Sequence, residues 1–140
     1  MDGRFGNNAF SGTLPGLDCV MDRVEVLSLA ENDLTGPLPN SFGDGNGGWT
    51  AAPFLSLREL HLYRNRLSST VPPGLLSGGG GCCPNLTSLL LGGNEFTGEL
   101  TPAGEEGKGS ALVHLYVLSG GLDGLASSTG LGGLAKLRLE

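Results

Sequence analysis

The chain has 140 residues, of which 39% are hydrophobic and 16% charged, and it contains 26 glycines. This size fits one domain with a real core, glycine does not recur at every third place as in collagen, and leucines spread along the chain argue against wholesale disorder. A net charge of −6 with eight dispersed lysines and arginines excludes a nucleic-acid partner, which needs a clustered basic face, and disfavours an anionic membrane surface.

The amino-terminal residues 1–10 contain no apolar h-region, so they do not form a signal peptide. The longest apolar stretches, such as Leu86–Leu91, are far too short to cross a bilayer, and we expect no membrane insertion by this chain. The three cysteines match no zinc pattern, because there is no second C-x-x-C pair and no spaced histidine pair. We therefore expect structural or free thiols and no metal site.

A segment of about a dozen positions recurs four times along the chain. Its frame is L-x-L-x-x-N-x-[LF]-[ST]-G-x-[LV]-P, and its successive asparagines are separated by 24, 33 and 29 residues. These asparagines are Asn8, Asn32, Asn65 and Asn94. A degenerate fifth copy at 112–122 has Gly120 in place of asparagine, and a sixth begins at Leu134.

The alternation in L-x-L predicts a short strand whose leucines point to one face and whose x residues point to the other. Stacking such strands side by side gives a parallel sheet with a continuous leucine core behind it. The asparagines fall where the chain must turn inward. Their amides can donate to and accept from backbone groups of adjacent coils that would otherwise be buried unpaired. Ordinary surface turn residues are the alternative interpretation of these asparagines.

Glycine has two expected roles. The frame glycines, which allow tight backbone turns, are Gly12, Gly36 and Gly98. Outside the frame, glycine-rich insertions at 43–48 and 78–81 explain the longer gaps and predict flexible loops away from the strands. Trp49 and Phe54 close the first insertion and are expected to fold back onto the core, and Cys83 is expected to be a buried thiol.

The frame resembles that of the leucine-rich-repeat family, L-x-x-L-x-L-x-x-N-x-L. Its S/T-G-x-[IL]-P tail is similar to the plant-type subclass, found in receptor-kinase ectodomains and cell-wall enzyme inhibitors. The resemblance runs from Phe5 to Leu139, although Ser69 replaces the frame glycine in the third copy.

This resemblance implies an α/β solenoid, a leucine-rich-repeat horseshoe of about five to six repeats. A short-stranded parallel sheet would form its concave face, and the convex side would be irregular or 3-10. We expect a single domain over 1–140, with repeats near 1–23, 24–53, 54–82, 83–108 and 109–130 and a partial repeat at 131–140.

The chemistry needed for catalysis is missing from the sequence. The segment 107–110, Gly-Lys-Gly-Ser, lacks the upstream glycine of a phosphate-binding loop because Pro102 stands there. His61 and His114 each lie next to a framework leucine, and no nucleophile elbow is present. We therefore predict no enzyme and no cofactor. Asn85 begins the sequon Asn-Leu-Thr and is a candidate glycosylation site if the protein enters the secretory pathway.

Binding in this family usually takes place on the concave face. The outward central positions are Arg4, Ser28, His61, Leu90, Tyr116 and Arg138. The flanking positions are Glu31, Glu59, Tyr63, Arg64, His114 and Lys136. Interface centres favour amphipathic aromatics and arginine, which bury a large area and keep a polar group. The candidate partner-binding patch is therefore His61, Tyr63, Arg64, Leu90, His114 and Tyr116. Solvated strand residues are the alternative interpretation.

The predicted function is a protein- or peptide-binding module, with a receptor-like ectodomain as one setting. An inhibitor of a secreted cell-wall-degrading enzyme and an intracellular scaffold are the alternatives. The resemblance implies an extracellular or membrane-attached protein, whereas the missing signal peptide leaves a cytoplasmic location open. No polar cap precedes Phe5 or follows Leu139, so we expect neighbouring repeats or a partner to cover the ends.

Overall fold

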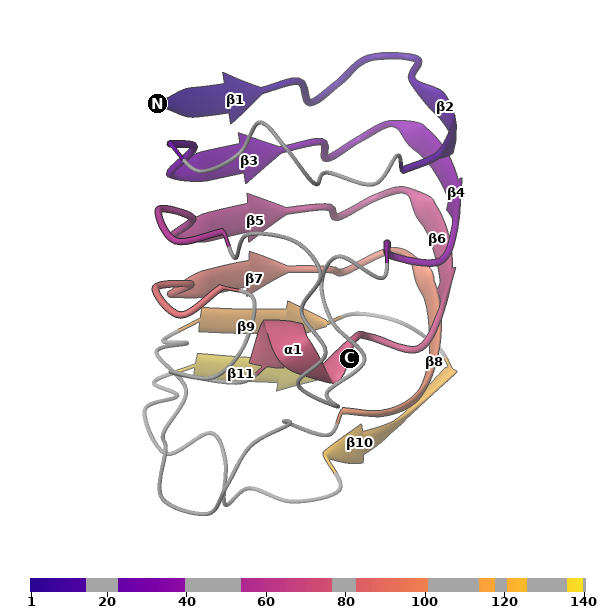
Figure 1. Cartoon of the computed structure of the whole chain (residues 1–140). Coiled ribbons are helices and arrows are strands. Elements are labelled where there is room, and N and C mark those ends of the chain that lie inside the picture. The colour runs from indigo at the N-terminus through magenta and orange to yellow at the C-terminus, as the bar shows by residue number, and fades with distance from the viewer. Residues whose placement is uncertain are drawn as a thin grey trace.

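The computed structural model is a solenoid, in which successive coils each contribute strands to two parallel sheets (Figure 1). The structure describes residues 1–14, 23–39, 54–76 and 83–100, together with the backbone of strands at 114–117, 121–125 and 136–139. Trp49, the two glycine-rich insertions and residues 101–113, 118–120, 126–135 and 140 lie outside the described residues.

The first sheet has six strands in the order β1-β3-β5-β7-β9-β11, all parallel. Its strands are β1 (Asp2–Arg4), β3 (Val26–Ser28), β5 (Glu59–His61), β7 (Ser88–Leu90), β9 (His114–Val117) and β11 (Lys136–Leu139). The first leucines of three frames, Leu27, Leu60 and Leu89, are direct partners across β3, β5 and β7. Each is at most 2% exposed, which confirms the prediction of a parallel sheet on a leucine core.

A second sheet runs down another side of the coils, in the order β10-β8-β6-β4-β2 (Figure 1). Its strands are β2 (Ser11–Thr13), β4 (Asp33–Gly36), β6 (Arg66–Ser69), β8 (Glu95–Leu100) and β10 (Gly121–Leu125). The family resemblance predicted irregular or 3-10 backbone outside the first sheet, and this second sheet was not foreseen. The first sheet fixes the spacing between coils, so the extended segments after each asparagine also come within pairing distance.

The frame glycines lie in strands of the second sheet and have a left-handed conformation. Gly12, Gly36 and Gly98 have φ values of 88°, 79° and 84°. Ser69 occupies the same position in the third coil and is held at φ 75°, a conformation that costs an L-residue free energy. A one-turn helix, α1 (Pro73–Leu76), follows this coil and directs Leu75 and Leu76 into the core.

The core is a stack of leucines from successive coils, continued by larger side chains between the sheets. Phe96 is fully buried, and the predicted burial of Phe54 and Cys83 is confirmed by exposures of 4% and 2%. The tail positions of the frame close the stack on the far side, and they are Leu14, Leu38, Val71 and Leu100. Each fully buried leucine contributes about 1.5–3 kcal/mol, so this stack is the main source of stability.

Asparagines bridge the coils at the turn between the two sheets. The Oδ1 of Asn65 accepts the backbone N–H of Leu34 at 3.1 Å. Its Nδ2 donates to the carbonyl of Leu29 in the preceding coil and to that of Leu62 in its own coil, each at 3.0 Å. The side chain is 7% exposed. These bonds satisfy backbone groups that the second sheet does not reach.

The same arrangement recurs in the neighbouring coils. Asn32 accepts the N–H of Phe10 at 3.1 Å, and Asn94 accepts the N–H of Leu67 at 3.0 Å. Both also donate to a carbonyl of the preceding coil. Asn8 differs, because its amide is exposed and donates only to carbonyls of its own loop.

Candidate functional site

Residues at alternate positions of the six-stranded sheet form two columns that cross the strands. The first column is Arg4, Ser28, His61, Leu90, Tyr116 and Arg138. The second is Asp2, Val26, Glu59, Ser88, His114 and Lys136. Neighbouring strands lie about 4.8 Å apart, so the backbone places four of the six predicted patch residues in adjoining positions: His61, Leu90, His114 and Tyr116.

The described side chains of these columns are held firmly by the sheet. In β3, β5 and β7 the central leucine is buried and the residues on both sides of it are half-buried. Side chains that are half-buried on a sheet lose little further conformational entropy when a ligand covers them. We call the surface formed by the two columns, with Tyr63 beside them, the open face.

Tyr63 stands in a third column whose other described members are small. The carbonyls of Ala30, Tyr63 and Gly92 occupy equivalent positions, since each accepts an N–H from the preceding coil at 2.8–2.9 Å. Ala30 and Gly92 are buried, whereas Tyr63 is half-exposed. The phenol ring is therefore the one large side chain described in this column, and the residues on either side of it are small.

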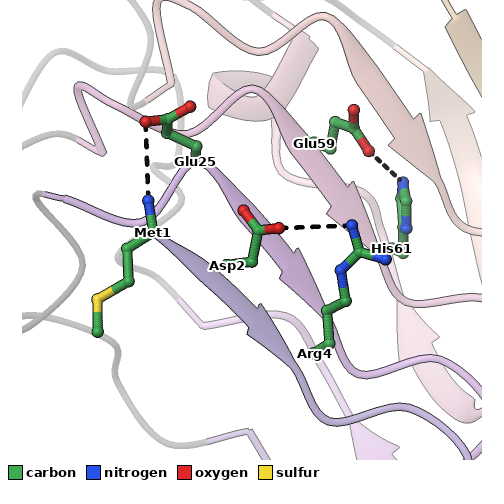
Figure 2. Close-up of polar contacts among 6 residues, drawn as sticks. All are labelled: Met1, Asp2, Arg4, Glu25, Glu59 and His61. Atoms are coloured by element: carbon green, nitrogen blue, oxygen red, sulfur yellow. Dashed lines mark hydrogen bonds and ion pairs between the residues drawn. The ribbon is translucent and has the colours of Figure 1, made fainter.

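His61 lies among charged groups near the middle of the open face (Figure 2). Its Nε2 is 3.3 Å from Oε2 of Glu59, and the guanidinium of Arg4 pairs with Asp2 at 3.4 Å. Burial lowers the pKa of His61 below its ordinary value by disfavouring the charged ring. Glu59 raises this pKa, but Arg4 lowers it further. The imidazole is therefore neutral at neutral pH, with one nitrogen donating and the other accepting.

Arg64 lies at the edge of the open face and not on it. Its Nη1 is 2.9 Å from Oε1 of Glu31 in the preceding coil, and the two side chains are 73% and 36% exposed. Backbone bonds place both residues one position beyond the third column, which contains Ala30, Tyr63 and Gly92.

Asn85 is exposed in the turn before β7, away from the open face. Its Nδ2 donates to the carbonyl of Leu55 at 2.8 Å, and the Thr87 hydroxyl donates to the carbonyl of Arg58 at 3.0 Å. Glycosylation at Asn85 stays a prediction.

The described residues were compared with the patterns typical of metal sites and of membrane-spanning helices. Among them, no group of three histidine, cysteine or acidic side chains could hold a metal ion. Within the same residues, no helix is both long and apolar enough to span a bilayer.

Sequence reasoning placed Arg4 and Glu59 in the outward columns but left both out of the predicted patch. The structure groups them with Asp2 around His61 (Figure 2). The signal was the register itself, since Arg4 and His61 stand on either side of Ser28 in one column. The predicted patch was chosen by residue type, favouring aromatics, and therefore omitted Arg4 and Glu59, the charged neighbours of His61.

Parallel strands stacked coil upon coil, bridging asparagines and one open side-chain face define a solenoid repeat protein. A family model described as Leucine Rich Repeat matches residues 23–44 and 56–77, which hold the second and third copies of the frame. These two segments of the chain are thus leucine-rich repeats.

The fold is similar to that of a solved structure titled "Crystal Structure of a Pollen Receptor Kinase 3", with a TM-score of 0.57 and 24% sequence identity. The match covers 87% of this chain and 62% of the other, so this chain spans only part of the length of that structure. Among curated protein sequences, none matches significantly. The matched repeats and the similar fold together show a leucine-rich-repeat solenoid.

Proposed function

We propose that the open face binds an extended segment of a protein or peptide that runs across the strands. The proposed contact residues are His61, Tyr63, Arg64, Leu90, His114 and Tyr116. The single observation that carries the proposal is the position of Tyr63, a half-exposed ring beside the buried small residues Ala30 and Gly92. A partly exposed aromatic ring flanked by small residues is the kind of anchor that dominates binding energy at interface centres.

The charges of the open face favour recognition by apolar contacts and hydrogen bonds. Asp2 pairs with Arg4, Glu59 contacts His61, and Glu31 pairs with Arg64. Asp2 and Glu31 are balanced by arginines, so of these three acidic groups Glu59, beside the neutral His61, leaves a single negative charge. Binding should therefore depend only weakly on salt concentration. Leu90 offers an apolar contact, and the neutral His61 both donates and accepts.

The similar fold of a pollen receptor kinase supports a receptor-like setting for this surface. Asn85 tests that setting, because a glycan there requires passage through the secretory pathway. The amide of Asn85 is exposed and reachable once its bond to the Leu55 carbonyl opens. Mass spectrometry of the protein from its native tissue should show occupancy at Asn85. An unmodified Asn85 there would favour the intracellular scaffold instead.

The binding proposal is tested by selecting peptides from a random display library on the intact chain and measuring their affinities by calorimetry. Tyr63→Ala and Leu90→Ala should each weaken the selected peptides at least tenfold, equivalent to about 1.4 kcal/mol. Leu55→Ala is the matched control, since Leu55 is 54% exposed in a turn outside the sheet. Equal affinity of all three variants and the wild type would place binding elsewhere.

A further inference from the structure

Glu59 carries a negative charge that no cation offsets among the described side chains of the open face. Its Oε2 lies 3.3 Å from Nε2 of His61 (Figure 2). That ring is neutral at neutral pH, because burial lowers the pKa of His61. A neutral imidazole offers the carboxylate a hydrogen bond and leaves its charge in place. By contrast, Glu31 at the edge of the face has a full cation, Arg64, at 2.9 Å.

The strands on both sides of β5 add no charge next to Glu59. Its register partners are Val26 in β3 and Ser88 in β7. Both are half-buried, and neither side chain ionises. The side chain of Glu59 is 45% exposed, so a ligand can reach its carboxylate from solvent. The charge therefore stands on an otherwise neutral part of the face.

The apolar contact at Leu90 lies within reach of this charge. Glu59 pairs with Ser88 and His61 with Leu90, so Glu59 and Leu90 are one strand and two residues apart. With a rise of about 3.3 Å per residue and strands about 4.8 Å apart, their Cα atoms are about 8 Å from each other. Lysine and arginine can lay their apolar stems along such a surface while their charged ends stay at its polar border.

A ligand that covers Glu59 must supply a partner for it. A carboxylate that loses its water is strongly unfavourable unless a cation or several donors replace that water. His61 supplies one donor, at Oε2. A basic side chain supplies both the charge and further donors, whereas an acidic side chain at the same place adds repulsion. The face therefore discriminates between ligands by charge at this one position.

We infer that Glu59 selects ligands that carry a basic side chain, whose charged end pairs with the Glu59 carboxylate while its stem lies along Leu90. This inference rests on the proposed binding of an extended segment by the open face, and it names a residue type that the segment carries. Tyr63 lies four residues after Glu59 and contacts an apolar or aromatic residue of the same segment. The recognised motif is a lysine or arginine close to an apolar residue.

His61 makes this selection depend on pH. The described groups around its ring are Asp2 and Arg4 from β1, Glu59 from β5, and the uncharged Ser28 of β3 and Leu90 of β7. Burial holds the pKa of His61 below its ordinary value of 6.5, so the ring becomes positive only in acid. The imidazolium then competes with the basic ligand residue for the same carboxylate. Affinity for a basic ligand should therefore fall as the pH drops.

Peptides selected from a random display library on the intact chain, at about pH 7.5, test the inference. Those that lose affinity on Tyr63→Ala should share a lysine or arginine at a fixed distance from an apolar residue. Replacing that basic residue of the peptide by methionine keeps a long apolar stem and removes the charge. This change should weaken binding to the wild type about tenfold in calorimetry.

Glu59→Gln keeps the size of the side chain and removes its charge, so it should reduce the preference for lysine over methionine to less than about twofold. Glu95→Gln is the matched control, because it makes the same change in net charge at an exposed residue of β8 in the second sheet. It should keep the full preference. At about pH 5 the wild type should lose most of the preference, whereas His61→Gln, which cannot gain a charge, should retain it.

Circular dichroism of the variants should match the wild type, since the replaced side chains are at least partly exposed. Selected peptides that need Tyr63 but show no preference for a basic residue would overturn the inference and leave the binding proposal standing. The same holds for a preference that survives Glu59→Gln. Peptides that are insensitive to both Tyr63→Ala and Leu90→Ala would overturn the binding proposal and this inference with it.

Discussion

Replacing Asn65 by alanine should test how the coils are held together. The amide connects three backbone groups that belong to two coils. Its Oδ1 accepts the Leu34 N–H at 3.1 Å, and its Nδ2 donates to the carbonyls of Leu29 and Leu62 at 3.0 Å. Alanine removes all of these bonds and changes no framework leucine. The variant therefore isolates the hydrogen-bonding role of the asparagine from the packing of the core.

The loss in the free energy of unfolding depends on which backbone groups are left without a hydrogen-bond partner. The Leu29 carbonyl keeps a bond from Asn32 at 3.0 Å, and the Leu62 carbonyl keeps one from Asn94 at 2.9 Å. The Leu34 N–H, by contrast, loses the Asn65 Oδ1 to which it donates, and Leu34 is 5% exposed. An orphaned buried donor costs about 1–3 kcal/mol, and the lost carbonyl bonds add about 1 kcal/mol. We expect Asn65→Ala to lower the free energy of unfolding by about 2–4 kcal/mol.

The other asparagines supply a graded series for the same reasoning. Alanine at Asn94 orphans the N–H of Leu67, which is 0% exposed, whereas alanine at Asn32 affects the N–H of Phe10, which is 47% exposed and can bond water. Asn8→Ala should cost less than about 1 kcal/mol, because its amide is exposed and bonds only within its own loop. The expected order of cost is Asn94, Asn65, Asn32, Asn8.

Urea unfolding followed by circular dichroism measures these differences from the midpoint at constant m-value. A changed m-value would mean that repeats unfold separately, and the free energies would then be compared coil by coil from amide exchange. Equal losses at Asn65 and Asn8 would refute the reasoning, since burial of the orphaned N–H could then not be the cause.

Three further changes follow from the same structure. Ser69→Gly should stabilise the fold by about 0.5–1 kcal/mol in urea unfolding, because glycine adopts φ 75° without the strain that serine carries. The conformational entropy that glycine loses on folding is smaller than the strain that is relieved. Gly36→Ser should destabilise it by about 1–3 kcal/mol, since it adds that strain at φ 79° and brings a Cβ to 3.0 Å from Thr13 Cγ2. The pKa of His61 is lowered by folding, so its neutral form stabilises the fold fully above the unfolded pKa near 6.5, and this contribution falls as pH drops through that value. His61→Gln should remove this part of the pH dependence. If the variant and the wild type show the same change in the free energy of unfolding between about pH 7 and pH 5, the role given to His61 is wrong.

The first sheet was predictable because two independent signals coincide in it. Leu27, Leu60 and Leu89 each begin an L-x-L alternation, and an asparagine stands five positions after each of them. The second sheet had no such signal. Its strands are mostly three to five residues long, and segments such as Ser11–Thr13 are exposed and carry no alternation. They pair because the first sheet has already brought the coils together, which no local pattern can show.

The open face was predictable to the level of columns and no further. Counting from the leucines places His61 beside Ser28 and Leu90, as the register shows. The direction of the His61 pKa depends on burial and on Arg4, which is 57 positions earlier in the chain (61 − 4). Only the folded chain brings such groups together, so the ionic setting of the face needed the structure.

The residue before each frame asparagine has a left-handed backbone and lies at the edge of the open face. Asn7, Glu31, Arg64 and Gly93 share this position and all have φ between 54° and 67°. A left-handed backbone costs Glu or Arg about 1–2 kcal/mol of strain. Glycine avoids this strain, but its more flexible unfolded chain costs about 0.5–1 kcal/mol of conformational entropy on folding.

Stability alone thus favours glycine at this position in the second and third coils, as at Gly93. The Glu31–Arg64 pair, with side chains 36% and 73% exposed, contributes about 0.2–1 kcal/mol shared between two strained residues. That gain does not offset the strain at both sites. The two charged side chains therefore lower the stability of the fold at these positions, and this cost supports the proposal that Arg64 contacts a ligand.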